Sequence, residues 1–403
     1  MPDTYTQPET VNSLPTPSFV VYEDKLRRNL NIIDSVRKRA GVEIIMAFKA
    51  NALWKTFGIF REYSFKSTAS SLNEMRLGND EFRQLVHSYC PVYTDDTIDD
   101  FLSGSSHITF NSVEQYLRFR DKLNRFNSEK GHHRVSPGLR VNPQCSVIET
   151  DIYNPALPGS RFGMTADMLG DNLPEGIEGL HFHQLCESSS YDLEKVLEAF
   201  ESQFGKFLDK LQWVNFGGGH LMTRKDYDVD HLVELLKGFK QRHPNLSVIL
   251  EPGSAFTWQT GDLITTVVDV VNNQGIRTAI IDASFACHMP DTLEMPYQPQ
   301  AALLNADHSL TECPSEQTPD AKLLPYRLGG NSCLSGDYKG DWYFPRELQA
   351  GDRLTLKDMN HYTTVKTTMF NGIQHPDIVF VKSDGSTELL RRFTYEDYRN
   401  RMS

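Results

Sequence analysis

One lysine follows a strand-like run at a position suited to covalent chemistry. The run from Val42 to Phe48 is apolar, branched and of strand length, and Lys49 comes directly after it. In an α/β barrel the active site lies at the carboxyl ends of the strands, where such a lysine would stand. Burial there lowers the pKa of an amine, which suits a Schiff base with an aldehyde cofactor. The same stretch also fits a lysine that only ends a strand and extends its ammonium into water.

Two glycine-containing loops follow later strand-like runs and could bind a phosphate. Gly217-Gly218-Gly219 comes after the seventh run of the barrel pattern, and Glu251-Pro252-Gly253 comes after the eighth. In a barrel these loops are neighbours, and backbone without side chains lets several N–H groups converge on an anion. The carboxylate of Glu251 could also hold the pyridine nitrogen of pyridoxal phosphate protonated, which makes the ring an electron sink. A tight turn and an ion pair at the barrel rim are the structural alternatives.

A histidine pair and a loop cysteine allow further chemistry. His181 and His183 lie two residues apart on one expected strand and therefore share a face. Such a pair could ligate zinc in a metal hydrolase if other His and Asp side chains completed the site, or His183 could stack on a cofactor ring. Cys333 lies in the glycine-rich segment from Gly329 to Asp337. That backbone can bring a small reactive side chain close to a ligand, although a structural cysteine would also fit there.

Composition limits the class of protein. The chain of 403 residues has room for two domains and an apolar content typical of globular proteins. Its net charge of −12 argues against non-specific nucleic-acid binding and is compatible with a cationic substrate. The six cysteines show neither a CxxC pair nor zinc-ligand spacing, so we expect no disulfide framework and no metal site. No stretch is long and apolar enough for a signal peptide or a membrane span, so we expect a soluble cytoplasmic protein without a membrane partner.

Strand-like and helical stretches alternate through most of the chain, which predicts a parallel α/β fold. Eight expected β segments cover residues 42–48, 67–70, 86–89, 107–110, 136–141, 179–183, 213–216 and 247–250. Eight such units, mostly paired with helices, favour a closed (β/α)8 barrel over an open sheet. A further strand at about 18–22 follows a loose tail at 1–15, and we expect it to join a second domain.

The pattern changes after Pro252. Extended runs rich in Val, Ile and Thr lie at 263–271, 278–282, 353–357 and 377–382, and little helical pattern appears before the tail at 395–402. We therefore predict a cofactor-binding barrel over residues 16–260 and a mostly antiparallel β domain, a barrel or sandwich, over 261–403. The polar stretch 307–321 is expected to be a flexible surface loop.

Taken together, these motifs resemble the fold III pyridoxal-phosphate decarboxylases. This group includes ornithine, arginine and diaminopimelate decarboxylases and is related to alanine racemase. The resemblance extends from Phe19 to about Phe393. The matching segments are Phe48–Asn51, His181–His183, Gly217–Gly219, Glu251–Gly253, Cys333 and Tyr362.

The resemblance implies pyridoxal phosphate as cofactor and a homodimer with shared active sites. Lys49 would bind the cofactor aldehyde, His183 would stack on the ring, and Glu251 would contact the pyridine nitrogen. The phosphate would contact Gly217, Gly218, Gly219, Gly253, Ser254 and Tyr362. Cys333 of a partner subunit would face the substrate and, like Lys49, could return a proton after loss of carbon dioxide.

Within this family the most specific resemblance is to the branch that decarboxylates carboxynorspermidine and carboxyspermidine. It is carried by segments 68–72, 182–187, 251–254, 287–297, 361–367 and 370–372. Ser254 stands where the ornithine and diaminopimelate enzymes usually have an arginine, and Leu334 stands where they have an acidic residue. The resemblance thus implies a carboxylated polyamine substrate of spermidine biosynthesis. Its ammonium groups would need carboxylates, for which Asp291, Glu294 and Asp337 are the candidates.

Other functions stay open at this point. A diaminopimelate or other basic amino-acid decarboxylase, or an amino-acid racemase of the same fold, would use the same lysine and phosphate loops. A non-enzymatic relative would usually have lost the cofactor lysine, whereas Lys49, Glu251 and Cys333 are all present. A metal hydrolase would contain zinc and no chromophore.

Overall fold

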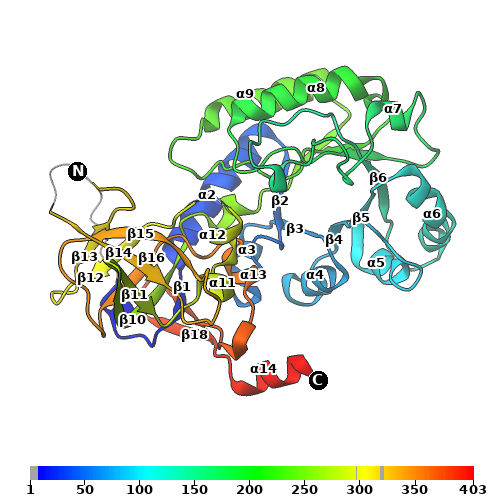
Figure 1. Cartoon of the computed structure of the whole chain (residues 1–403). Coiled ribbons are helices and arrows are strands. Elements are labelled where there is room, and N and C mark those ends of the chain that lie inside the picture. Colours follow the sequence, from blue (N-terminus) through cyan, green and yellow to red (C-terminus); the bar gives the residue numbers. More distant parts are fainter. Residues whose placement is uncertain (1–7, 296, 318–321) are drawn as a thin grey trace. The chain divides into compact units, whose positions relative to one another are not determined.

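Two units, each with its own sheet, make up the part of the chain that the structure describes. The computed structural model covers residues 8–295, 297–317 and 322–403. One unit, here called the barrel unit, comprises Asn29–Phe256, and the other, the β unit, comprises Met1–Arg28 and Thr257–Ser403. Helix α2 (Glu23–Ala40) begins in the β unit and continues in the barrel unit. Figure 1 shows the chain with many of its elements labelled.

The barrel unit contains a closed sheet of parallel strands, as the sequence predicted. Its strands are β2 (Glu43–Ala47), β3 (Lys66–Ala69), β4 (Val86–Tyr89), β5 (Ser105–Phe110), β6 (Ser136–Arg140), β7 (Gly179–His181), β8 (Trp213–Asn215) and β9 (Ser247–Leu250). They pair in chain order, and β9 closes the barrel by pairing with β2. The eight segments expected from the sequence overlap these eight strands, and the predicted fold class is confirmed.

Helices connect the barrel strands. They are η1 (Trp54–Thr56), α3 (Phe57–Glu62), α4 (Leu72–Leu77), a π turn (Gly78–Phe82), α5 (Ile98–Gly104), α6 (Val113–Ser128), η3 (Asp151–Tyr153), α7 (Ala166–Leu169), α8 (Ser190–Leu208), α9 (Val229–Arg242) and α10 (Ser254–Thr257). Ser189 and Asp192 form a capping box at the start of α8, which satisfies backbone N–H groups that a helix end leaves free. Helices α8 and α9 lie side by side (Figure 1). Within the described ranges no helix is long and apolar enough to cross a bilayer.

A large aromatic side chain fills one layer of the barrel. The indole of Trp213 covers two glycines, because a Cβ built on Gly138 or Gly179 would lie only 2.3 or 2.1 Å from its ring atoms. The indole N–H donates to Ser136 Oγ at 2.9 Å. The ring of His107 meets this indole edge-on with centroids 5.3 Å apart, and stacks on the ring of His87 at 3.9 Å.

The β unit is built mainly on antiparallel pairs. Its strands are β1 (Ser18–Tyr22), β10 (Gly261–Asn273), β11 (Ile276–Ile281), β12 (Ala301–Leu304), β13 (Leu310–Cys313), β14 (Leu324–Gly329), β15 (Tyr338–Phe344), β16 (Arg353–Leu356), β17 (Asp377–Val381) and β18 (Thr387–Arg391). Strand β1 pairs antiparallel with β10 and parallel with β17, so it belongs to this sheet rather than to the barrel.

Short helices interrupt this β unit, and the sequence pattern did not predict most of them. They are α1 (Glu9–Asn12), α11 (Phe285–His288), α12 (Pro290–Glu294), α13 (Thr363–Lys366), η4 (Phe370–Gly372) and α14 (Tyr395–Met402). Apart from α14, each is too short to show a helical repeat of apolar residues. Their positions are set by caps and tertiary contacts, such as the Cys287 N–H that donates to Ser284 Oγ at the start of α11.

Two predicted irregular segments contain regular structure. The tail expected at 1–15 includes α1, where Val11 is fully buried against Val20, Ile264 and Val381. Part of the loop expected at 307–321 is strand β13, which pairs with β12 and buries Cys313 in the core. In both cases one buried apolar side chain fixes a stretch of polar appearance. Residues 1–7 and 318–321 lie outside the described residues.

The stacked histidines predict an acid-sensitive barrel. Burial lowers the pKa of His87 to about 3 and that of His107 to about 2 in the folded chain. An unfolded histidine titrates near 6.5, so the unfolded state takes up protons first as the pH falls through 6.5. Each pH unit below this value costs about 1.4 kcal/mol per histidine that stays neutral when folded.

The free energy of unfolding should fall between pH 7.5 and pH 5.5. We expect this fall to be about 1 kcal/mol smaller in His87→Phe than in wild type. Denaturant unfolding followed by tryptophan fluorescence at both pH values measures this loss. His132→Phe, at an exposed ring that stacks on Phe126 in the same unit, is the matched control and should leave the loss unchanged. An unaltered pH dependence in His87→Phe would refute the assignment.

Candidate functional site

Lys49 stands at the mouth of the barrel on a rigid support. The preceding Phe48 is fully buried and packs against Phe57 and Phe82, with ring centroids 5.1 and 5.7 Å apart. Lys49 itself is half-buried, and its ammonium makes no hydrogen bond or ion pair with any described residue. Burial lowers the pKa of Lys49, and the charge of Glu251 opposes that shift. The Lys49 amine therefore lies within the electrostatic influence of the Glu251 carboxylate and forms no structural hydrogen bond or ion pair with a described residue.

Glu251 follows β9, the strand that pairs with the strand before Lys49. Its carboxylate is buried; Oε1 accepts a hydrogen bond from Asn215 Nδ2 at 2.7 Å. Oε2 lies 3.6 Å from His181 Nε2. Burial raises the pKa of Glu251, whereas the Asn215 hydrogen bond and the charge of Lys49 lower it. The carboxylate can therefore exchange a proton with a bound group more readily than an exposed one.

The two predicted histidines belong to β7 and the residues just after it. His183 Nδ1 accepts a hydrogen bond from the Gly218 N–H at 3.0 Å, so its proton is on Nε2. Burial and the charges of Lys49 and Arg140 hold the pKa values of His181 and His183 well below the usual value, so both rings are neutral. Both ring nitrogens of His181 are buried without a hydrogen-bond partner among the described residues.

These histidines and Glu251 also have the geometry that the metal alternative requires. One ligand atom from each of His181, His183 and Glu251 lies within 4.8 Å of the others. Two imidazoles and a carboxylate are a known zinc set. Lys49 and Arg140, however, place positive charge beside the same atoms, which disfavours a divalent cation.

The glycine loop fits against β7 and β9 so closely that side chains are excluded. A Cβ on Gly217 would lie 2.4 Å from the Phe182 carbonyl oxygen, and one on Gly218 would lie 2.6 Å from the Glu251 carbonyl oxygen. Gly219 has a φ of +89°, and its Cβ would lie 2.2 Å from the Leu185 carbonyl oxygen. This loop provides open backbone of the kind that cradles a phosphate.

Gly253 and Ser254 continue the next loop. Both are buried, and Ser254 begins the short helix α10. The Gly253 carbonyl oxygen accepts the Phe256 N–H at 3.1 Å. Their expected phosphate contact stays a prediction.

Arg140 is a site residue that the sequence reasoning missed. It ends β6, is buried, and places its guanidinium 4.6 Å from the ring centre of Tyr89 and 4.5 Å from that of Phe162. Its Nη2 lies 3.4 Å from the His183 carbonyl oxygen, and its Nε has no partner among the described residues. A charged residue at the carboxyl end of an expected barrel strand was the signal that could have identified it.

In the β unit, Cys333 lies in a loop that Asp337 anchors. The Asp337 carboxylate is buried and accepts hydrogen bonds from Ser284 Oγ at 2.8 Å, the Ala286 N–H at 2.9 Å, and the N–H and Oγ of Ser332 at 3.1 and 2.5 Å. These hydrogen bonds hold the loop around the Asp337 carboxylate. The expected substrate contact of Asp337 stays a prediction.

Cys333 itself is exposed, and its backbone N–H donates to Asn371 Oδ1 at 2.9 Å. Leu334, Tyr338 and Phe370 around it are also exposed, by 45, 40 and 49%. The loop therefore presents the thiol at the surface of the β unit, where the apolar Leu334 and the polar Ser335 and Asn371 are exposed too.

The other predicted residues of the β unit differ in the contacts that their side chains make and in their backbone conformation. Asp291 is buried; its Oδ2 accepts from Tyr297 Oη at 2.6 Å and Thr363 Oγ1 at 3.0 Å, while Oδ1 has no hydrogen-bond partner among the described residues. Glu294 forms an ion pair with Lys366. Tyr362 immediately precedes α13 with a φ of +51°, which is rare for a bulky side chain.

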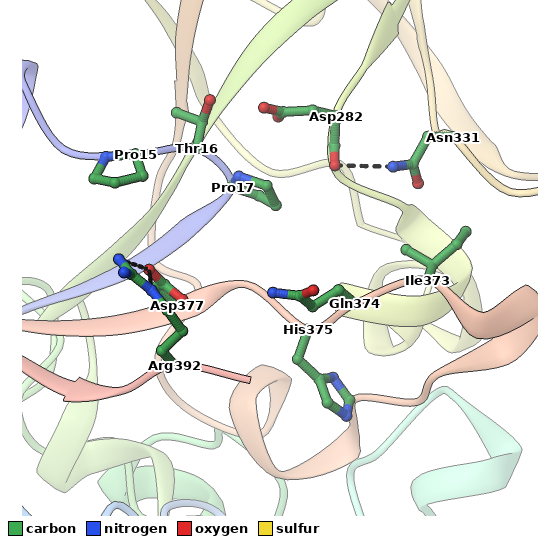
Figure 2. Close-up of a pocket in the computed structure, with 10 residues that line it drawn as sticks. All are labelled: Pro15, Thr16, Pro17, Asp282, Asn331, Ile373, Gln374, His375, Asp377 and Arg392. Carbon is green, nitrogen blue, oxygen red and sulfur yellow. Dashed lines mark hydrogen bonds and ion pairs between the residues drawn. The ribbon is translucent and has the colours of Figure 1, made fainter. Parts of the chain in front are cut away.

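A pocket of about 510 Å³ in the β unit borders the segment that carries Cys333 (Figure 2). It is lined by Pro15, Thr16, Pro17, Asp282, Asn331, Ile373, Gln374, His375, Asp377 and Arg392. Figure 2 shows Asn331 donating to the Asp282 carbonyl oxygen, at 3.0 Å, and Arg392 paired with Asp377, at 2.8 Å. Two pairs of its lining residues thus bind each other, and none of the residues predicted for the cofactor lines it.

The glycine requirement can be tested by a matched pair of substitutions. Gly219→Ala would force a side chain into a left-handed conformation and against a backbone carbonyl, so we expect a loss of about 2 kcal/mol or more in the free energy of unfolding. Gly205→Ala in α8, where nothing lies within 4 Å of the added Cβ, should stabilise the chain by about 0.5 kcal/mol or more. Denaturant unfolding measures both. Equal effects of the two substitutions would contradict the strained geometry.

Comparison with known proteins identifies the chemistry of this site. Residues 19–360 match the family described as pyridoxal-dependent decarboxylase, C-terminal sheet domain. Carboxyaminopropylagmatine decarboxylase of Synechocystis sp. is 45% identical and is covered over 96% of its length by 97% of this chain. Carboxynorspermidine/carboxyspermidine decarboxylase of Campylobacter jejuni is 39% identical over 95% of this chain and 97% of the relative.

The solved structures agree. The crystal structure of carboxynorspermidine decarboxylase from Campylobacter jejuni in complex with norspermidine matches with a TM-score of 0.84 and 37% identity, over 96% of this chain and all of that one. Diaminopimelate decarboxylases match at lower identity. The expected family, cofactor and class of enzyme are thereby confirmed, and the metal-hydrolase alternative loses its support. The chain belongs to the pyridoxal-dependent decarboxylases.

Proposed function

We propose that this chain removes the carboxylate of a carboxylated polyamine as carbon dioxide, with pyridoxal phosphate bound in the barrel mouth. The observation that carries the proposal is the constellation of Lys49, Glu251 and the glycine loop on adjoining strands. The relatives that match at 33–45% identity over nearly the whole chain are decarboxylases of such compounds.

The described residues fit pyridoxal phosphate. Lys49 has an amine without a structural partner, and the glycine loop has backbone that any Cβ would obstruct. The neutral, half-buried His183 offers a flat ring, and Glu251 offers a buried carboxylate oxygen that Asn215 leaves unoccupied. A flat, anionic, nitrogen-containing ring system requires this set of groups.

The bound cofactor supplies an electron sink for the pair of electrons left when the bond to the carboxylate breaks. Glu251 holds a proton at the pyridine nitrogen, which strengthens that sink. The buried Arg140, at the end of the strand next to β7, adds positive charge beside His181 and His183. A proton replaces the lost carboxylate on the same carbon, and Cys333 of a partner subunit or Lys49 donates it.

Asp291 is the best candidate for recognising an ammonium group of the substrate. One of its oxygens is held by Tyr297 and Thr363, and the other is buried without a partner among the described residues. A buried, unpaired carboxylate oxygen is costly unless a ligand supplies a donor. Glu294 is a weaker candidate because Lys366 already pairs with it.

A second substrate deserves equal testing. The relative at 45% identity acts on carboxyaminopropylagmatine by its name, which places a guanidinium at the remote end in place of an ammonium. A planar guanidinium binds a carboxylate through two parallel hydrogen bonds and would suit Asp291 or Glu294.

The exposed Cys333 loop supports a homodimer with shared active sites. The exposed Leu334 and Phe370 in the two segments that meet at Cys333 offer apolar contacts to a partner. We infer that this surface of one copy completes the barrel mouth of the other.

The first experiment is to measure carbon dioxide release by the purified holoenzyme. Carboxyspermidine, carboxynorspermidine, carboxyaminopropylagmatine, meso-diaminopimelate, arginine and ornithine would be offered separately. We expect turnover to be confined to the first three, and their kcat/KM ratio to identify the preferred substrate. Turnover of diaminopimelate or arginine alone would refute the proposal, and inversion of a stereocentre without carbon dioxide would favour a racemase.

Repeating the same assays on Asp291→Asn tests the proposed substrate contact. The change keeps the shape and removes the charge, so we expect KM for the preferred substrate to rise at least tenfold, as loss of a charge-assisted hydrogen bond of about 1.5–3 kcal/mol implies. Asp341→Asn, a partly exposed carboxylate of β15 paired with Arg327, is the matched control. An unchanged KM in Asp291→Asn would remove this residue from the substrate site.

Mixing two inactive variants tests the shared site. Lys49→Ala lacks the cofactor amine and Cys333→Ala lacks the loop thiol, so a mixed dimer has one intact site. Random subunit exchange places half of the dimers in the mixed form, and we expect up to about a quarter of wild-type activity per total site. If exchange is shown by mass and no activity returns, the shared arrangement is wrong.

A further inference from the structure

Asn215 joins two parts of the cofactor site that are separate in the sequence. It is the last residue of β8, and its amide is buried. Nδ2 donates to Glu251 Oε1 at 2.7 Å, and Oδ1 accepts the Gly217 N–H at 2.9 Å. The orientation of the amide is fixed by its partners, because a carboxylate only accepts and a backbone N–H only donates.

A backbone hydrogen bond connects the same two residues, Gly217 and Glu251. The Glu251 N–H donates to the Gly217 carbonyl oxygen at 2.7 Å, and His220 Nε2 lies 3.1 Å from that oxygen. Gly217 has a φ of +68° and leaves no room for a Cβ. The first glycine of the loop and the carboxylate of Glu251 are therefore held in one hydrogen-bonded unit, and the Asn215 side chain is its only side-chain bridge within the described residues.

We propose that Asn215 is a positioning residue for pyridoxal phosphate, whose amide fixes the Glu251 carboxylate relative to the phosphate-binding loop and thereby sets cofactor affinity. The inference rests on the proposed role of Glu251. A side chain at this position must donate on one side and accept on the other. Aspartate has the same shape but offers no donor, and it would place a second negative charge beside Glu251.

The test measures cofactor affinity directly. Apo protein, prepared by removing the cofactor with hydroxylamine, is titrated with pyridoxal phosphate and followed by tryptophan fluorescence. We expect Asn215→Asp to weaken binding at least tenfold. Asn142→Asp makes the same chemical change at another buried bridging amide, which contacts Pro155, Gln144 and Gln184, and should stay within twofold of wild type.

A double substitution separates positioning from a general structural role. In Asn215→Asp combined with Glu251→Gln, the new amide donates to the new carboxylate, so the hydrogen bond returns with reversed direction. Adding Asn215→Asp to Glu251→Gln should therefore change cofactor affinity less than threefold. With saturating cofactor, Asn215→Asp should lower kcat and leave KM for substrate within twofold. If Asn215→Asp does not fold, Asn215→Ser, too short to reach Glu251, tests the bridge in the wild-type background and should also weaken cofactor binding at least tenfold, and unchanged affinity would refute the inference.

The outcomes distinguish the inference from the proposed function. The inference is refuted if Asn215→Asp lowers cofactor affinity equally in wild type and in Glu251→Gln, or lowers it in neither. In that case a loss of affinity in Glu251→Gln alone would still support the role of Glu251. Wild-type cofactor affinity in Glu251→Gln would refute the role of Glu251 and the inference together. Because no substrate is present in the titration, none of these results depends on which polyamine is decarboxylated.

Discussion

The burial of opposite charges at the mouth of a closed barrel is the constraint on which this site depends. Lys49 and Glu251 follow β2 and β9, the two strands whose pairing closes the sheet. Burial favours the neutral form of each side chain, and each one's charge favours the ionised form of the other. This balance leaves both groups able to exchange protons, and it exists only because the barrel closes.

Other residues at the barrel mouth maintain that balance because their hydrogen bonds fix the positions of the surrounding groups. The Gly218 N–H fixes the proton of His183, and Asn215 fixes one oxygen of Glu251. Arg140 adds a buried cation. Its guanidinium makes a cation–π contact with the ring of Tyr89 and no ion pair with a carboxylate of a described residue. Two basic side chains, Lys49 and Arg140, act on the Glu251 carboxylate, and Glu74 acts on Lys49 as a second acidic group.

The sequence could predict the role of a residue where that role depends on the residues next to it in the chain. Lys49, the glycine loop and Glu251 were predictable because a strand, a turn and a carboxylate lie within a few consecutive residues. Asn215 and Arg140 were not, since their roles arise from which strands adjoin in the closed sheet. Asp337 was predicted only as a carboxylate for the ammonium groups of the substrate, and the folded loop shows in addition four donors that bind it.

The loop of Cys333 shows what one buried acid contributes to the β unit. A Cβ on Gly330 would lie 2.3 Å from the Asp337 carboxylate, so the backbone closes tightly around that charge. The same carboxylate accepts from Ser284, and the Cys287 N–H of α11 donates to that serine, four residues before Asp291 in α12. One buried charge thus orders both the loop that presents the thiol and the helix pair that carries the unpaired carboxylate oxygen. The β unit therefore holds Cys333 and Asp291 on one hydrogen-bonded framework.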